Sequence, residues 1–110
     1  MFDESENGLR ITTTELGDAT LLALQGELDP LTAPDLLARV DDVLSQSDTT
    51  HLVFDVGGLT FIDSSGLRTL IATKRSMLER GGDLEIRNAT TKTRRLLEIT
   101  GLDTFLQVTP

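Results

Sequence analysis

The sequence predicts an α/β fold: a mixed sheet of four to five strands that opens with an antiparallel hairpin and is covered by helices. Two apolar segments, over 9–14 and 19–25, lie on either side of a short turn and predict the hairpin. Helical patterns then precede each of the later short strands, over 51–56 and 84–87, so crossover connections and parallel pairing follow. The chain of 110 residues has the size of one domain, which predicts a single core.

The amino-terminal part divides into an acidic leader and the hairpin. Residues 1–8 are polar and acidic, so we expect a flexible leader there and a folded domain over 9–110. From Leu9 onward apolar and polar residues alternate, which is typical of a half-buried strand. The run over 19–25 is more apolar and predicts a more buried second strand, which Gly26–Pro30 is expected to end.

The start of the first helix carries its own signals. Thr32 stands where an N-cap is expected, and Asp35 follows three positions later as its reciprocal partner. Leu31 and Leu36 are spaced for a hydrophobic staple across this cap. One face of the helix is apolar and predicts packing on the sheet; its residues are Leu36, Leu37, Val40, Val43 and Leu44.

The second helix is predicted over 65–79, after Gly57–Gly58 breaks the strand over 51–56. A last helix is predicted over 91–100, and apolar residues over 105–108 are expected to pack the tail. In the second helix the apolar face consists of Leu67, Leu70, Ile71 and Leu78, with Lys74, Arg75 and Glu79 mostly opposite.

Composition excludes several classes of function. The formal net charge of −8 argues against binding to nucleic acid or to an anionic membrane surface, so a macromolecular partner is expected to be a protein. The absence of cysteine excludes disulfides and thiol catalysis and fits a reducing compartment. No uncharged apolar run approaches the roughly 18 residues that span a bilayer, and the acidic start does not resemble a signal peptide. We therefore expect a soluble, cytoplasmic protein that does not insert into membranes.

The reactive side chains do not support an enzyme. His51 is the only histidine, and we interpret it as a strand-edge residue; the paired serines also lie outside a G-x-S-x-G motif, which excludes a serine hydrolase. No Gly-Lys dipeptide precedes the hydroxyls, as a P-loop requires. The acidic residues near the start and the pair Asp41–Asp42 lack the spacing of a calcium loop. We expect neither a cofactor nor a metal site.

The stretch FIDSSGLRTL carries the main functional signal, because Ser64 and Ser65 are adjacent where a predicted strand leads into a helix. One interpretation is that a serine caps the helix through an amide of the first turn. The other is an anion cradle, in which free amides, the close approach allowed by Gly66 and the guanidinium of Arg68 suit a phosphate or a partner's carboxylate. A second hydroxyl then supplies a phosphate acceptor. The pattern alone does not separate the two serines.

Two motifs carry a resemblance to a known family. The element Gly26–Asp29 (GELD) and the stretch Phe54–Leu70 (FDVGGLTFIDSSGLRTL) resemble the STAS domain of anti-sigma factor antagonists, and the predicted order of elements agrees over nearly the whole chain. The DSSG match in its strand-to-helix setting is the specific part. The resemblance implies a STAS-like fold and makes Ser64 the phosphate acceptor.

The resemblance also implies partners. An anti-sigma factor that is itself a serine/threonine kinase is expected to bind the unphosphorylated protein and thereby release its sigma factor. Phosphorylation of Ser64 by that kinase ends the contact, and a serine phosphatase resets the protein. A phosphoserine adds about −1.5 to −2 charge and three acceptor oxygens, which would repel an acidic or apolar partner face.

Five residues are expected to form the phosphosite environment and the partner contact: Asp29, Asp63, Ser65, Gly66 and Arg68. Asp29 has two interpretations, which the sequence leaves open: it orients the Ser64 hydroxyl, or it is the first residue of an Asp-Pro turn. For Asp63 we favour a loop carboxylate that accepts hydrogen bonds from nearby amides. Gly66 is expected to let the helix start lie close to its neighbours.

Two functions of other classes remain open. STAS domains also serve as soluble accessory subunits of membrane transporters, and this chain could dock on a transporter ATPase instead of a kinase. It could also be a scaffold or sensor module that binds a small anion or a nucleotide at the helix start. The complete phosphoacceptor motif favours the antagonist over both alternatives.

Overall fold

The computed structural model describes residues 8–109. The predicted leader therefore lies outside the described residues except for Gly8, and the boundary at residue 9 stays a prediction. In chain order the elements are β1 (Leu9–Leu16), β2 (Ala19–Leu28), α1 (Ala33–Gln46), β3 (His51–Ile62), α2 (Ser64–Glu79), β4 (Asp83–Arg87), α3 (Thr91–Ile99), α4 (Leu102–Leu106) and β5 (Val108–Thr109).

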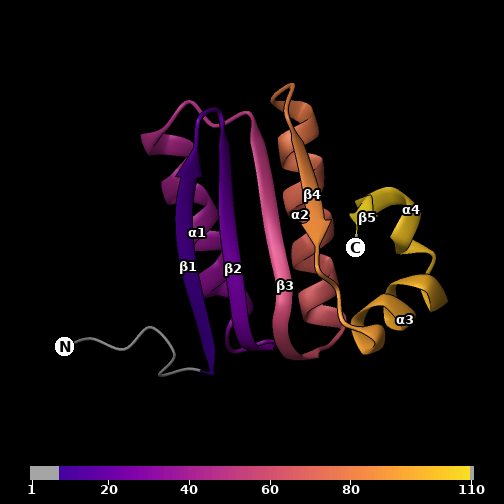
Figure 1. Ribbon diagram of the computed structural model, residues 1–110. Coiled ribbons are helices and arrows are strands. Elements are labelled where there is room, and N and C mark those ends of the chain that lie inside the picture. The colour runs from indigo at the N-terminus through magenta and orange to yellow at the C-terminus, as the bar shows by residue number, and fades with distance from the viewer. Residues whose placement is uncertain (1–7, 110) are drawn as a thin grey trace.

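The strands form one five-stranded mixed sheet in the order β1-β2-β3-β4-β5 (Figure 1). β1 and β2 pair antiparallel, and the other neighbours are parallel. The hairpin turn contains Gly17, whose φ of +71° lies in the left-handed region that tight hairpin turns require. The predicted fold class is confirmed, including the opening hairpin.

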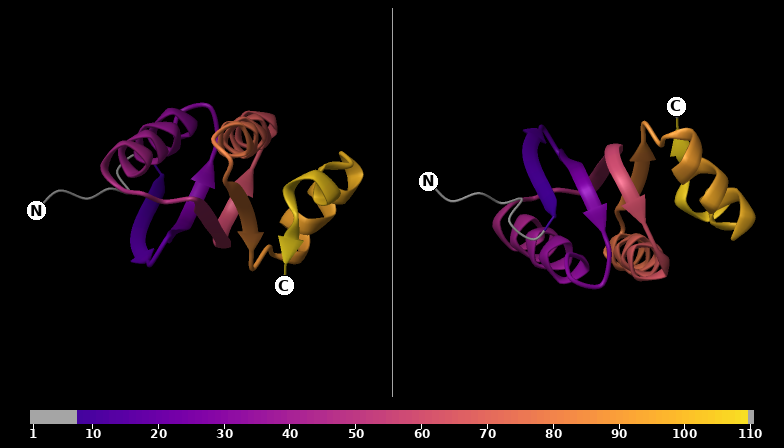
Figure 2. Two further views of the ribbon diagram at one scale, coloured as in Figure 1. Left: turned by 90° about the horizontal axis from the view of Figure 1, so that it is seen from above. Right: turned by 90° about the horizontal axis from the view of Figure 1, so that it is seen from below.

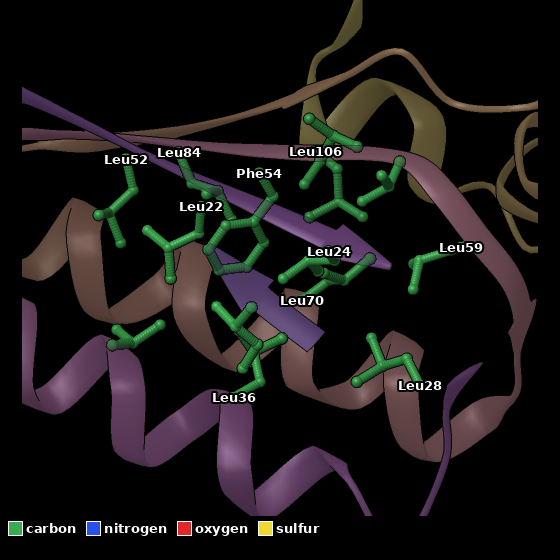
Figure 3. Close-up of a cluster of buried hydrophobic side chains, with 14 of the residues drawn as sticks. Leu22, Leu24, Leu28, Leu36, Leu52, Phe54, Leu59, Leu70, Leu84 and Leu106 are labelled. Atoms are coloured by element: carbon green, nitrogen blue, oxygen red, sulfur yellow. The ribbon is translucent and has the colours of Figure 1, made fainter. Parts of the chain in front are cut away.

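The helices are distributed unevenly around the sheet. Both views in Figure 2 show α1 and α2 on the same face, while α3 and α4 lie beyond β4 at one edge. The core therefore forms between this face and the two long helices. Leu22 pairs with Phe54, and Phe54 pairs with Ile86, so their side chains share that face. All three are 0% exposed, and Figure 3 shows Leu22 and Phe54 gathered with helix residues such as Leu36 and Leu70.

Two predicted strand ends are wrong. β2 continues past Gly26 to Leu28, and β3 continues through Gly57 and Gly58 to Ile62. Register shifts between Ala23 and Gln25 and between Gly26 and Glu27 show that the paired strands carry irregularities here. A Cβ on Gly58 would lie 2.7 Å from Cγ of Gln25, so the glycine allows close approach of β2 instead of ending the strand.

The position of the first helix's cap is confirmed, since Thr32 is the N-cap residue of α1, but its predicted side-chain hydrogen bond is not formed. Thr32 makes no side-chain cap hydrogen bond; its hydroxyl donates to the carbonyl of Glu27 at 2.8 Å. Leu31 is 65% exposed, so it does not form the buried staple with Leu36. Leu37 on the predicted apolar face is 40% exposed as well. These two leucines instead belong to the outer surface near the start of α1.

Two predicted positions on the faces of α2 are wrong. Lys74 is only 3% exposed, whereas Leu78 is 48% exposed and Met77 is fully buried in its place. Lys74 is buried because its ammonium forms a salt bridge with Asp83 and donates to the carbonyl of Leu84. Lys74 can thus pack inward because groups of β4 satisfy its charge and its hydrogen bonds. Hydrophobic periodicity does not detect such pairing.

Three further details differ from the sequence-based prediction. The tail forms a short helix, α4, and a fifth strand, β5, where only packed apolar residues were expected. Leu106 is the buried residue of α4, while Phe105 is 36% exposed. His51 opens β3, which has a neighbour on each side, so it is not a residue of an edge strand.

Candidate functional site

Asp63 organises the junction between β3 and α2. It has an extended backbone, with φ of −119°, and it is the N-cap of α2. Its Oδ1 accepts hydrogen bonds from the amide of Ser65 at 2.9 Å and from the amide of Gly66 at 3.2 Å. The expected amide bonds of Asp63 are therefore present, and neither serine is the cap. Because Asp63 occupies these two amides, the predicted cradle of free amides is wrong at both positions.

The two serines differ in their surroundings. Ser64 is exposed at the first position of α2, and its side chain has no hydrogen-bond partner among residues 8–109. Ser65 is half-buried, and its Oγ accepts a hydrogen bond from Arg68 Nη2 at 3.4 Å. Ser64 thus presents an accessible and unengaged hydroxyl, while the hydroxyl of Ser65 is held against the helix.

Gly66 brings the start of α2 against the sheet. It is buried, and a Cβ there would lie 2.6 Å from Cγ1 of Ile62 and 3.0 Å from Cγ of Leu28. Leu28 and Ile62 pair with each other at the ends of β2 and β3. The glycine therefore allows a contact between helix and strands that any side chain would push apart.

Asp29 follows the end of β2, beside this junction. Its Oδ1 accepts hydrogen bonds from the amides of Leu31 and Thr32, each at 3.0 Å. Leu28 of the same strand end accepts a hydrogen bond from the amide of Asp63 at 3.4 Å. Of the two interpretations of Asp29, these hydrogen bonds therefore support the turn residue. Among residues 8–109 it makes no hydrogen bond to Ser64, so the orienting role stays a prediction.

A shallow groove lies between α1 and α2, and Ser65 is the member of the serine pair that lines it. It has a volume of ≈ 380 Å³, and Arg68 and Ser65 line its α2 side. Leu37 and Pro34 line the α1 side. Arg68 is exposed, so the groove combines apolar walls with one available cation. This groove was not predicted from the sequence, because Leu37 was expected in the core; the helical pattern does not separate a core leucine from one at the margin.

The single histidine does not lie beside the paired serines. His51 opens β3, and Ser64 follows the far end of the same strand, so the histidine and the serine lie at opposite ends of it. Residues 8–109 contain no cluster of three or more histidine, cysteine, aspartate or glutamate side chains that could hold a metal ion. Within the same residues no helix is long and apolar enough to cross a membrane.

Comparisons with known proteins agree with the fold. A family model described as "Mlab, STAS domain" matches residues 11–108, and the chain therefore belongs to the STAS domain family. The anti-sigma factor antagonist of Mycobacterium paratuberculosis has a similar crystal structure, with a TM-score of 0.82 and 27% identity, covering 96% of this chain and 88% of that one.

Two relatives in sequence carry related names. The anti-sigma F factor antagonist of Paenibacillus polymyxa is 28% identical over 82 residues, which are 74% of this chain and 70% of that protein. The anti-sigma-B factor antagonist of Staphylococcus aureus (strain NCTC 8325 / PS 47) is 29% identical over 100 residues, which are 91% of this chain and 92% of that protein.

Proposed function

We propose that this protein is an anti-sigma factor antagonist whose unphosphorylated form binds an anti-sigma factor serine/threonine kinase and frees a sigma factor. The observation that carries the proposal is the exposed, unengaged hydroxyl of Ser64 at the start of α2. The names of the bacterial relatives give the same class of function. Sigma factors act in the cytoplasm, so the proposal includes a cytoplasmic location.

The surroundings of Ser64 support its role as the phosphate acceptor. A kinase must bring a serine hydroxyl in line with the γ-phosphate of ATP. This requires the least free energy when the hydroxyl is exposed and has no competing hydrogen bond to break. Ser65 would first have to give up Arg68 and its half-buried position. Ser64 is therefore the substrate of a partner kinase, and a serine phosphatase reverses the modification.

The groove between α1 and α2 supports a partner contact beside the serine. Its apolar walls suit an apolar anchor side chain of the kinase, and Arg68 suits a carboxylate next to that anchor. A phosphate on Ser64 would add about −1.5 to −2 charge beside Asp63 and would compete for the guanidinium of Arg68. Both effects weaken a contact with an acidic partner segment.

The test uses Ser64→Asp and Ser64→Ala in a binding assay with the anti-sigma factor of the same genome. Ser64→Asp is expected to weaken binding at least about tenfold, since like charge at an interface is repulsive. Ser64→Ala should bind as the wild type does and accept no phosphate when incubated with ATP. Ser76→Asp is the matched control, because Ser76 is an exposed serine of the same helix away from the junction. Equal affinity of the wild type and Ser64→Asp would contradict the switch.

A pull-down from native lysate tests the proposal against the transporter alternative. Wild type and Ser64→Asp serve as parallel baits, and mass spectrometry identifies the captured proteins and the phosphate site. A kinase held by the wild type alone, with phosphate on Ser64, supports the antagonist. A transporter subunit held equally by both baits, without phosphate on Ser64, supports an accessory subunit.

A further inference from the structure

A second hollow lies between the end of β3 and α3. It has a volume of ≈ 270 Å³ and shares no lining residue with the groove between α1 and α2. The strand side is formed by residues 59–62, and α3 closes the other side. Neither the proposed phosphorylation nor the proposed kinase contact uses the α3 side of this hollow. The proposed function therefore does not account for the residues on the α3 side of the hollow.

The walls of the hollow are largely apolar. Leu59 at the strand side is 4% exposed, and Leu96 on α3 is half-buried. At the rim, Phe61 is 42% exposed and Ile99 is 76% exposed. Two large apolar side chains thus remain in water beside an apolar depression. A ligand that covers these two side chains removes their apolar surface from water, which favours binding.

Two cations stand at the same rim. Lys92 and Arg95 are three positions apart, so they project from one face of α3. Both side chains are exposed, and neither has an ion pair or hydrogen bond among residues 8–109. Lys92 also stands in the first turn, where the helix dipole disfavours a cation, so helix stability does not explain its position. On a chain with a net charge of −8, these two charges make the hollow a local site for an anion.

We propose that this hollow binds a medium-chain carboxylic acid in its ionised form. The acyl chain lies along Phe61 and Ile99, and the carboxylate lies between Lys92 and Arg95, whose guanidinium suits a carboxylate in bidentate geometry. The hollow of ≈ 270 Å³ lies just below the roughly 300–1,000 Å³ of typical small-molecule sites, so it suits a short chain and not a large cofactor. The proposal does not depend on phosphorylation of Ser64.

A titration of the full ¹⁵N-labelled chain with sodium octanoate tests the proposal by nuclear magnetic resonance. Saturable shifts are expected in the amides of residues 59–62 and 92–99, at concentrations below those at which octanoate forms micelles. Octan-1-ol, which has the same chain without the charge, should bind more weakly. Butyrate, which keeps the charge with a much shorter chain, should also bind more weakly, because both parts of the ligand contribute.

Matched variants separate the cations of the hollow from other charges. The double variant Lys92→Gln with Arg95→Gln is expected to weaken octanoate at least about tenfold, since hydrogen bonds to charged groups contribute strongly. Arg94→Gln is the control, because Arg94 is on the same helix but does not line the hollow, and its effect should stay below about twofold. Ile99→Ser should also weaken binding, and it should fold normally because Ile99 is 76% exposed.

Four outcomes would overturn the proposal. The first is the absence of saturable shifts, and the second is equal binding of octanoate and octan-1-ol. The third is equal weakening by Arg94→Gln and the double variant. The fourth is shifts at residues 59–62 and 92–99 that depend on protein concentration without octanoate, which would make the hollow a contact between copies of the chain. Binding of an acidic, apolar peptide where octanoate fails would instead indicate a protein partner.

Discussion

Gly66 allows the start of α2 to pack closely against the ends of β2 and β3. Any side chain there would meet Ile62 and Leu28, because a Cβ would lie 2.6 Å and 3.0 Å from their nearest atoms. Ser64 stands two positions earlier, so the same contact holds the serine at the end of the sheet. The glycine of the DSSG motif therefore has a structural cause that is independent of any bound phosphate.

We predict that Gly66→Ala lowers the free energy of unfolding by about 1–3 kcal/mol, as overpacking in a core usually does. Part of this loss is offset by the better helix propensity of alanine, which is worth up to about 1 kcal/mol. Urea denaturation measures the change. In an Ile62→Ala background the same substitution should cost less, because the nearest atom of Ile62 is removed. An equal cost in both backgrounds would contradict the steric explanation.

The start of α2 depends on a single carboxylate. Asp63 accepts hydrogen bonds from two amides of the first turn, and it also carries a negative charge at the positive end of the helix. By contrast, α1 starts with a threonine whose hydroxyl is directed back to Glu27. The two long helices thus begin by different means, and the cap of α2 is the one beside the exposed serine.

We predict that Asp63→Ala lowers the free energy of unfolding by about 0.5–2 kcal/mol, the usual cost of losing an N-cap. Asp63→Asn should retain most of the stability, since an amide oxygen also accepts the hydrogen bonds. Thermal and urea denaturation of the three proteins measure this order. If Asp63→Ala is as stable as the wild type, the two amide bonds contribute nothing and the assignment of the cap is wrong.

At the scale of the whole molecule, Lys74 connects parts of the fold that are distant in sequence. Its ammonium contacts the carboxylate of Asp83, the carbonyl of Leu84 and Oε1 of Gln107, so α2, β4 and the segment before β5 meet at one buried group. The hydrogen bond from Lys74 lowers the pKa of Asp83 below its ordinary value of 3.8, although partial desolvation opposes this. An unpaired Lys74 at this depth would be costly.

We predict that this pair makes the fold sensitive to acid. A carboxyl group with a lowered pKa in the folded state contributes stability above its unfolded pKa of 3.8, and the contribution is lost as the pH falls through the folded pKa. Urea denaturation over about pH 5 to pH 2 should therefore show a steeper loss for the wild type than for Asp83→Asn. The side chain of Asp83 is 32% exposed, so solvent screening reduces the difference. Parallel pH curves would contradict a contribution from the pair.

Local patterns in the sequence were enough to predict the mixed sheet, its opening hairpin and the helix that follows the serine pair. These features depend on periodicity and turn residues within a few positions of each other. Strand ends were not predictable in the same way. Gly57 and Gly58 have the pattern of a strand break, but pairing with β2 on one side continues the strand to Ile62.

The environment of each side chain could be determined only from the folded molecule. Leu37 and Leu78 fit apolar helix faces but are 40% and 48% exposed, while Lys74 is buried because Asp83 and Leu84 lie within reach. The two serines are neighbours in the chain and chemically identical, so no local pattern separates them. Packing of α2 on the sheet leaves the Ser64 hydroxyl exposed and turns that of Ser65 toward Arg68, because the cap at Asp63 sets where the helix begins.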